Sequence, residues 1–297
     1  MKPSGLSRRE FMKLAGLGGV VLVSGCATGP GATGAVAESE FYFVQLSDPH
    51  WGFEGPDINP DAKVTLKKAV AAVNAMSPQP DFVVFTGDLT HTTDDPKERR
   101  RRMAEFRDIA SALKVKDVHF MPGEHDASLD NGKAFKEFFG ATHYTFDHKG
   151  VHFITIDNVS DPMASIGEEQ LRWLAADLAA QPKDARIVVL THRPLFDLYP
   201  QWDWATRDGA QAIALLQTHD NVTVFYGHIH QENHFMTGNI AHHSAKGLMF
   251  ALPAPGSQPK RLPIPWDASA PYKGLGWRDI EAETTPVHYA ITELPVA

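Results

Sequence analysis

Acidic and imidazole side chains stand in short groups at five points of the sequence, each directly after an apolar run that predicts a β-strand. The groups are Asp48 with His50, Asp88 alone, Glu124 with His125, His192 alone, and His228 with His230. Each group alone is weak evidence, because an Asp before Pro is common in turns and a single His is usually a polar surface residue. Parallel α/β sheets place their ligands at the carboxyl ends of strands. We therefore predict that these five strand ends lie in series on one sheet edge and form one site.

The residue types in these groups are metal ligands. Carboxylate and imidazole ligands without thiolate suit iron, manganese, zinc or cobalt and disfavour a closed structural zinc site. Pro49 favours an extended conformation at Asp48, and residues two apart in an extended chain point the same way, so Asp48 and His50 are expected to share a target. The same spacing predicts Cα atoms about 6.6 Å apart for His228 and His230. That distance suits one ligand to each of two ions held ~3.5–4 Å apart.

Asp88 follows the most strand-like stretch of the chain. Residues 82–85 are an unbroken apolar run between Pro80 and Gly87, which is typical of a strand buried on both faces inside a parallel sheet. Gly87 allows a sharp turn at the strand end. We predict that Asp88 bridges two metal ions at the centre of the site.

Apolar runs alternating with amphipathic stretches predict an α/β fold for residues 40–297. Strands are predicted at residues 41–46, 82–85, 117–121, 144–147, 151–156, 186–191, 221–226, 232–237, 240–244, 248–252 and 287–294. Helices are predicted at residues 60–76, 97–113, 133–139 and 167–180. The basic run 99–102 is interpreted as a solvated helix face. The Pro-rich segment 253–286 is predicted to be a long loop whose aromatic residues either cover the site or pin the loop to the core.

Composition limits the function. The chain has 297 residues, of which 43% are hydrophobic and 22% charged, which is enough for a sizeable core. The net charge is −8, and since the first 26 residues carry +3, the remainder carries −11. An acidic body repels a phosphate backbone and argues against general nucleic-acid binding. The single cysteine, Cys26, excludes an internal disulfide framework.

The first 26 residues resemble a twin-arginine signal peptide. Arg8 and Arg9 lie in the sequence SRREFMK, and the apolar run 14–23 that follows is too short to cross a ~30 Å hydrocarbon core. The sequence VSGC ending at Cys26 resembles a lipoprotein cleavage box, and cleavage after Ala37 is the alternative. Residues 27–39 are interpreted as a flexible tether. These features predict an exported, periplasmic or extracytoplasmic protein that uses the twin-arginine export machinery, with a lipidated Cys26 at the membrane surface if the cleavage box is used.

The order of the five groups resembles the calcineurin-like metallophosphoesterase superfamily over residues 40–294. The motifs are Asp-x-His, Gly-Asp, Gly-x-His-Asp, His and Gly-His-x-His, and residues 144–178 look like the branch with bacterial cyclic-AMP phosphodiesterases. The resemblance implies an α/β fold, a four-layer α/β/β/α sandwich of two mixed sheets flanked by helices. It also implies a hydrolase for phosphate mono- or diesters, with a small phosphate-ester substrate.

The resemblance implies a role for each group. Asp48, His50 and His230 would hold the first metal ion, and His192, His228 and Glu124 the second, with Asp88 bridging. A bridging hydroxide would attack phosphorus while His125 assists the leaving oxygen. An iron–manganese or iron–zinc pair is expected, and other divalent pairs stay open.

The sequence departs from the family pattern at two places. Glu124 stands where the family has Asn, which adds a negative charge and favours either a ferric–divalent pair or weak turnover. The alternative function is therefore a non-catalytic or weakly catalytic metal-binding lipoprotein, although the retained His125 argues against it. His91 stands where some members carry a helper Asp, and it is either a substrate contact or an exposed loop residue. Arg193 is likewise either a phosphate contact or a surface residue.

Overall fold

The structure, a computed structural model, describes residues 40–283 and 288–297. The twin-arginine leader, the tether, Cys26 and the cleavage site after Ala37 lie outside these residues and stay predictions. Within the described ranges, none of the helices has the length and apolar character needed to cross a membrane.

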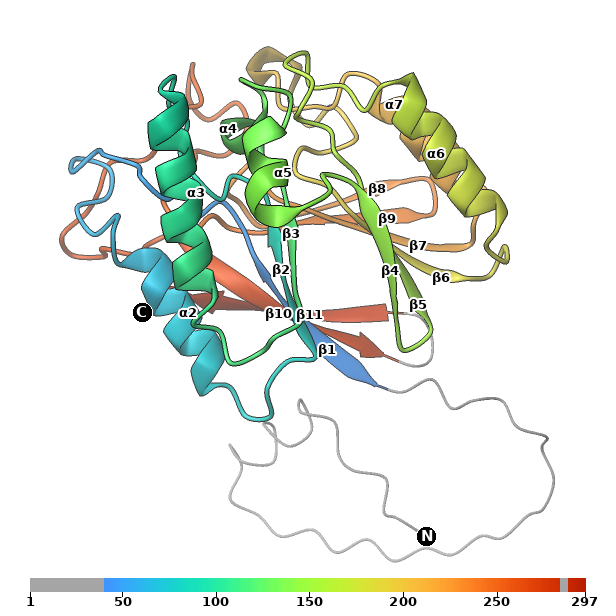
Figure 1. The fold of residues 1–297 in the computed structure, drawn as a ribbon, viewed down its shortest axis with the longest axis horizontal. Helices are drawn as coiled ribbons and strands as arrows, with labels where there is room; N and C mark the ends of the chain where they lie inside the picture. The colour runs from blue at the N-terminus through green and yellow to red at the C-terminus, as the bar shows by residue number, and fades with distance from the viewer. Residues whose placement is uncertain (1–39, 284–287) are drawn as a thin grey trace, which may run out of the picture. The chain divides into compact units, whose positions relative to one another are not determined.

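The described strands form two mixed sheets (Figure 1). The first sheet has the order β11-β10-β1-β2-β3, and its strands are β1 (Phe41–Leu46), β2 (Phe82–Thr86), β3 (Val118–Met121), β10 (Gly276–Glu283) and β11 (His288–Pro295). The second sheet has the order β4-β5-β6-β7-β9-β8, and its strands are β4 (Tyr144–His148), β5 (Val151–Thr155), β6 (Arg186–Leu190), β7 (Asn221–Tyr226), β8 (Asn233–Thr237) and β9 (Ile240–Ser244). Strands β1, β2 and β3 pair in parallel, as do β5, β6, β7 and β9. The outer pairings, with β10, β11, β4 and β8, are antiparallel.

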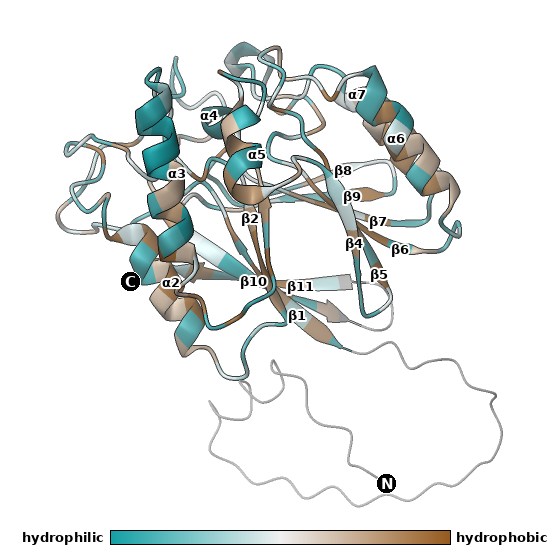
Figure 2. Cartoon of the chain, viewed as in Figure 1, coloured by the Kyte–Doolittle hydropathy of each residue, from teal (hydrophilic) through white to brown (hydrophobic). Residues whose placement is uncertain are grey.

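Helices cover the outer face of each sheet. The helices are α2 (Thr65–Ala75), α3 (Pro96–Ala110), α4 (Glu124–Ala127), α5 (Lys133–Phe139), α6 (Glu168–Ala179) and α7 (Gly209–Leu216), with one 3-10 turn at Pro200–Trp202. One apolar cluster joins α2, α3 and α5 to the first sheet, and another joins α6 and α7 to the second. Figure 2 shows mainly apolar residues in β1 and β2, whereas most residues of α3 are hydrophilic. The predicted four-layer sandwich of two mixed sheets with flanking helices is confirmed.

Aromatic residues fill the space between the two sheets. Phe43 and Phe82 of the first sheet stack with ring centroids 4.8 Å apart, and Phe153 of the second meets Phe82 edge-on at 5.3 Å. All three rings are buried. Burying such rings contributes roughly 1.5–3 kcal/mol each, and this layer fixes how the two sheets face one another.

Several predicted elements are wrong. Residues 248–252 form no strand; their apolar side chains enter the cores from irregular backbone. The predicted loop 253–286 instead contains β10, a strand of the first sheet, and Trp277 on it is buried in the apolar cluster with α2 and α3. Helix α7 was not predicted, and α2 begins at Thr65 because the residues before it form turns, with the Asn59 side chain accepting from the Asp61 amide.

The basic run on α3 is not simply a solvated face. Arg99 is buried and pairs with Asp130 at 2.9 Å, while Arg100 pairs with Glu137 at 2.7 Å. Arg102 donates to the carbonyl of His91 at 2.9 Å. The run therefore attaches α3 to α5 and to the loop after β2, which carries candidate site residues.

A buried ion pair links β10 to β11 and gives a stability prediction. Arg278 is fully buried, pairs with Glu293 and donates to the carbonyl of Ser244 on the second sheet. Glu293→Gln leaves the guanidinium without its carboxylate in the core, so we expect a loss of about 3 kcal/mol in the free energy of unfolding. Urea denaturation measures the loss. Glu54→Gln, on an exposed residue, is the control and should stay within about 0.5 kcal/mol of wild type; equal losses in both variants would show that the pair is not stabilising.

Candidate metal centre

The five predicted groups meet, but they come from two sheets rather than one edge. Strands β1, β2 and β3 of the first sheet and β6 and β7 of the second each end at one of the groups. The two sheets pack face to face with these strand ends on the same side of the sandwich (Figure 1). The prediction of a single sheet edge is therefore wrong, because it did not divide the strands between two sheets.

The backbone after β1, β2 and β7 is left-handed, not extended. Positive φ angles occur at Asp48 (53°), His50 (40°), Asp88 (49°), His228 (65°) and His230 (52°). The extended geometry expected for both period-two pairs is therefore wrong. A positive φ costs a non-glycine residue about 1–3 kcal/mol, so the surrounding structure must hold these turns. Backbone bonds do so: the amide of Asp48 donates to Gly87 at 3.2 Å, and that of His50 to Asp88 at 2.9 Å.

Two glycines allow the close approach of these turns. Gly87 has φ +93°, and a Cβ there would collide with the His192 ring. A Cβ on Gly123 would collide with the amide and carboxylate of Asp88. Any side chain at either position would displace a candidate ligand.

The first group of candidate ligands consists of Asp48, His50 and His230, each with one ligand atom within 4.8 Å of the others. The Nε2 atom of His230 lies 3.2 Å from Oδ1 of Asp48 and 3.2 Å from Nε2 of His50. The Nδ1 atom of His230 donates to the carbonyl of Phe250 at 2.6 Å. That bond leaves the Nε2 lone pair facing the group, as in metal-binding histidines.

The second group consists of Asp88, Glu124, His192 and His228. Oε2 of Glu124 lies 2.8 Å from Nε2 of His192, and Oε1 lies 2.9 Å from Nδ1 of His228. His192 Nδ1 donates to the carbonyl of Thr86 at 2.7 Å, which directs Nε2 to the group.

Asp88 lies between the two groups. Its Oδ2 atom is 3.5 Å from Nε2 of His50 in the first group and 3.4 Å from Nε2 of His192 in the second. Its Oδ1 atom accepts from the backbone amide of His125 at 2.9 Å, which fixes the carboxylate plane. Among these ligands, Asp88 is thus placed to contact two ions at once.

The described residues fit two cations. Glu124 Oε2 and His192 Nε2 are buried without a hydrogen-bond partner, even though they lie only 2.8 Å apart. Buried polar atoms are normally satisfied, so unsatisfied lone pairs that face one another call for a shared cation. Oxygen and imidazole donors without sulfur suit hard or borderline metal ions.

Burial keeps several of the imidazoles neutral. It lowers the pKa of His228 to about 4 against the opposing pull of Glu124, and it lowers the pKa of His50 well below its usual value. For His230, burial acts to lower the pKa, but Asp48, the carbonyl of Phe250 and the charge of Asp88 together raise it. A neutral imidazole offers its lone pair to a metal ion, and where a carboxylate favours the imidazolium, the metal competes with the proton.

Asp126 fixes the loop after Asp88 to α4. The residue is part of the Gly-x-His-Asp motif, but no role was predicted for it from the sequence. Its carboxylate accepts from the amides of Leu89, Thr90 and Gly123 at 2.8–2.9 Å and from the Thr90 hydroxyl at 2.8 Å. Burial raises the pKa of Asp126 to about 7, and the negative charge of Asp88 adds to the shift, while the amide bonds oppose it. This clamp sets the spacing between the bridging candidate and Glu124.

His91 and His125 lie together at the mouth of the centre. Their rings stack at 4.8 Å, and with His50 they form a third cluster of imidazoles. The amide of Thr92 donates to Nδ1 of His125 at 3.2 Å, so in the neutral ring the proton resides on Nε2, 4.0 Å from Oδ2 of Asp88. His91 is half-buried, so the reading as an exposed loop residue is wrong, and burial lowers its pKa to about 4.

Arg193 is neither on the surface nor free to move. Its Nε donates to the carbonyls of Trp204 and Ala205 at 3.2 Å, and its Nη2 to the carbonyl of Asp203. The reading as a surface residue is wrong, since the side chain is buried. Arg193 holds the segment that carries Trp204 over the site, and its contact with substrate stays a prediction.

A cavity of about 280 Å³ opens above the centre. Besides the candidate ligands His50, Asp88, Glu124, His228 and His230, it is lined by His91, His125 and several residues that the sequence did not single out. These are Phe53, Trp204, Phe250, Leu252, Arg261 and Pro263. They belong to no motif and come from three separate connections between strands and helices, so no local signal marked them. Of these, Arg261 is the residue that adds a cation to an otherwise aromatic and imidazole wall.

Comparison with known proteins identifies relatives of this chain. Residues 41–232 match the calcineurin-like phosphoesterase family. The chain is 27% identical over 181 residues to the serine/threonine-protein phosphatase CPPED1 of Danio rerio, a match that covers 52% of this chain and 57% of that protein. It is 27% identical over 201 residues to a probable cyclic nucleotide phosphodiesterase of Rhodococcus erythropolis, covering 64% of each chain. The chain thus spans less than two thirds of these two relatives.

The fold has solved counterparts as well. A dimetal phosphatase from Danio rerio superposes with a TM-score of 0.61 at 13% identity, over 86% of this chain and 96% of that one. The two ligand groups at the five strand ends are consistent with the family match over residues 41–232. The chain belongs to the calcineurin-like phosphoesterase family.

Proposed function

We propose that this chain is an exported, dinuclear-metal hydrolase of phosphate mono- or diesters. The observation that carries the proposal is the position of Asp88, whose Oδ2 lies 3.4–3.5 Å from one imidazole of each ligand group. The names of the relatives, phosphatases and phosphodiesterases, support the reaction class. The leader motifs around Arg8, Arg9 and Cys26 support export, and a lipidated Cys26 remains part of the proposal.

The chain supplies a holder for the ions and a proton donor beside them. Asp48, His50 and His230 would hold one ion and Glu124, His192 and His228 the other, with Asp88 shared. When bound, two such ions activate water at neutral pH and neutralise charge on the phosphoryl oxygens.

His125 would act on the leaving oxygen. Its Nδ1 accepts from the Thr92 amide, so its Nε2 carries the proton and faces the centre. That proton is available to the alkoxide that forms as the ester bond breaks, which contributes typically 10²–10⁴-fold in rate. The aromatic walls of Phe53, Trp204 and Phe250 exclude water around the reacting groups.

A substrate panel tests the proposal. We expect the metal-loaded protein to hydrolyse at least one of para-nitrophenyl phosphate, bis-para-nitrophenyl phosphate, a cyclic nucleotide or a glycerophosphodiester. The release of product is followed by absorbance or by a phosphate assay. The contact of Glu124 with both His192 and His228 favours a second candidate, a metal-binding protein without turnover. Two bound ions with no activity on any of these esters would support that candidate and reject the hydrolase.

A further inference from the structure

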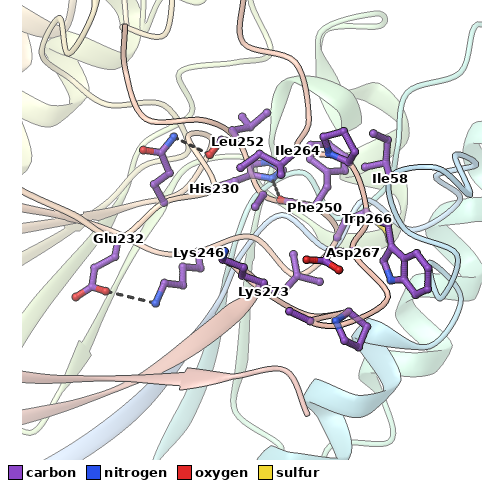
Figure 3. Close-up of a pocket in the computed structure, with 18 residues that line it drawn as sticks. Ile58, His230, Glu232, Lys246, Phe250, Leu252, Ile264, Trp266, Asp267 and Lys273 are labelled. Atoms are coloured by element: carbon purple, nitrogen blue, oxygen red, sulfur yellow. Dashed lines mark hydrogen bonds and ion pairs between the residues drawn. The ribbon is translucent and has the colours of Figure 1, made fainter. Parts of the chain in front are cut away.

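A second and larger cavity adjoins the metal centre (Figure 3). Its volume is about 540 Å³, and it lies between residues 249–252 and the loop 264–275. It shares three lining residues with the 280 Å³ cavity over the centre, namely His230, Phe250 and Leu252. A ligand bound at His230 is therefore next to both spaces.

One loop segment runs from the first cavity to the second. Arg261 and Pro263 line the cavity over the centre, whereas Ile264 and Trp266 line the second cavity. Together with Leu252, which lines both, this segment forms a continuous wall between the two. A substrate longer than its phosphate group can follow this wall away from the metal centre.

The second cavity is lined largely by apolar residues, and two of the charged groups at its border, Lys246 and Asp267, already have partners. Its apolar lining includes Met249 and Leu275, and Figure 3 shows Ile58, Ile264 and Trp266 on its wall. The ammonium of Lys246 pairs with Glu232 at 3.4 Å, and the carboxylate of Asp267 accepts from the amide and hydroxyl of Ser269. An uncharged, apolar ligand group fits this space best, because Lys246 and Asp267 already have partners and Lys273 is exposed, so that water solvates its charge.

The wall is fixed before any ligand arrives. The amide of Trp266 donates to the carbonyl of Asp57 at 2.8 Å, and that of Ile264 to the carbonyl of Ala251 at 2.9 Å. The hydroxyl of Tyr272 donates to Asp61 at 2.7 Å. A pre-formed wall loses little entropy when it binds a ligand.

Large apolar side chains on this wall are left exposed. Ile264 is 44% exposed and Trp266 39% exposed. Burying such surface under a ligand stabilises the complex by roughly 25 cal/mol per Å², and an indole favours a flat ring in offset or edge-on contact. The volume is within the usual range of sites for small organic molecules, about 300–1,000 Å³.

We propose that this second cavity, the alcohol pocket, binds an apolar, ring-containing alcohol portion of the phosphate ester while the phosphate lies at the metal centre. The inference rests on the proposed function and adds the class of substrate. It assigns Trp266 and Ala270, both at the pocket wall, as residues that determine specificity.

Matched esters test the alcohol pocket. Ethyl and 2-(1-naphthyl)ethyl esters of phosphate have leaving alcohols of similar acidity and differ in the ring alone. We expect kcat/KM to be about tenfold or more higher for the naphthyl ester, since apolar pockets discriminate on this scale. Trp266→Ala and Ala270→Leu should remove the preference by raising KM for the naphthyl ester, with the ethyl ester unchanged. Ala254→Leu, an exposed position of the same loop outside both cavities, should change neither.

Binding separates this inference from the proposed function. Calorimetry with ethylphosphonate and 2-(1-naphthyl)ethylphosphonate on the metal-loaded protein needs no turnover. A Kd at least about tenfold lower for the naphthyl compound, lost in Trp266→Ala or Ala270→Leu, supports the pocket even if no ester is hydrolysed. Equal affinity for the two phosphonates, or a preference that survives in both variants, would overturn it. The two variants are independent, so a folding defect in one does not decide the outcome.

Discussion

Asp88→Asn is expected to lower turnover by about a thousandfold or more while leaving the fold intact. The Oδ2 atom of Asp88 is the atom that lies beside both His50 and His192. Replacing the carboxylate by an amide removes one negative charge and puts a donor where an acceptor is needed. The two ligand groups then lose the side chain that joins them, so we also expect the content of tightly bound metal to fall from two ions towards one.

Element analysis after desalting measures the metal content, and the most active ester of the panel measures turnover. The matched control is Asp157→Asn, because Asp157 is also a buried carboxylate after a strand end but belongs to neither ligand group. Its carboxylate accepts from the nearby amides of Val159 and Ser160. Should Asp88→Asn keep two ions and more than about a tenth of the activity, the bridging role would be rejected.

The sequence predicted the parallel strands best, because buried strands need unbroken apolar runs. Residues 82–85 became β2, buried throughout and paired in parallel on both sides. The same rule failed at residues 248–252, where an apolar run packs into the core but makes only isolated backbone bonds, to Ser47 and Ile264, and forms no strand. The rule also missed a real strand, β10, because its sequence GWRDIEAE is too polar to be predicted as a buried strand. Arg278 can be buried in that strand because its guanidinium pairs with Glu293 on β11 and donates to the carbonyl of Ser244 on the second sheet.

The identity of the candidate ligands was readable, but their geometry was not. The period-two argument for Asp48 and His50 assumed an extended chain, whereas both residues have positive φ. Their convergence depends on bonds to Gly87 and Asp88, which are about 40 residues away along the chain. Local sequence cannot contain such contacts.

The walls of the site were missed for the same reason. Phe53, Trp204 and Arg261 lie on separate loops with no shared motif, and only tertiary packing brings them to one cavity. Arg193 was predicted either at the surface or on a phosphate, yet its guanidinium holds the carbonyls that position Trp204. An arginine that binds backbone carbonyls leaves no pattern in the sequence.

Glu124→Asn is expected to change which metal ions the centre holds. Asp48, Asp88 and Glu124 bring three negative charges to the two ligand groups, and both oxygens of Glu124 face histidines of the second group at 2.8 and 2.9 Å. One unit charge at ~4 Å and an effective dielectric constant of ~20 amounts to about 4 kcal/mol. The extra carboxylate therefore favours a ferric ion over a divalent one at the second position by up to about a thousandfold.

We expect wild-type protein prepared in air to hold a ferric–divalent pair and the Asn variant to hold two divalent ions, as measured by element analysis with iron spectroscopy. Glu124→Gln removes the charge but keeps the length, and Glu124→Asp keeps the charge but shortens the side chain. If charge is the cause, Gln follows Asn and Asp follows wild type. If side-chain length is the cause, the Gln variant behaves like wild type and the Asp variant behaves like the Asn variant. A wild-type centre that is purely divalent and fully active, whether prepared with or without oxygen, would contradict the ferric preference, because the third carboxylate would then have no measurable effect on the ions that Asp88 joins.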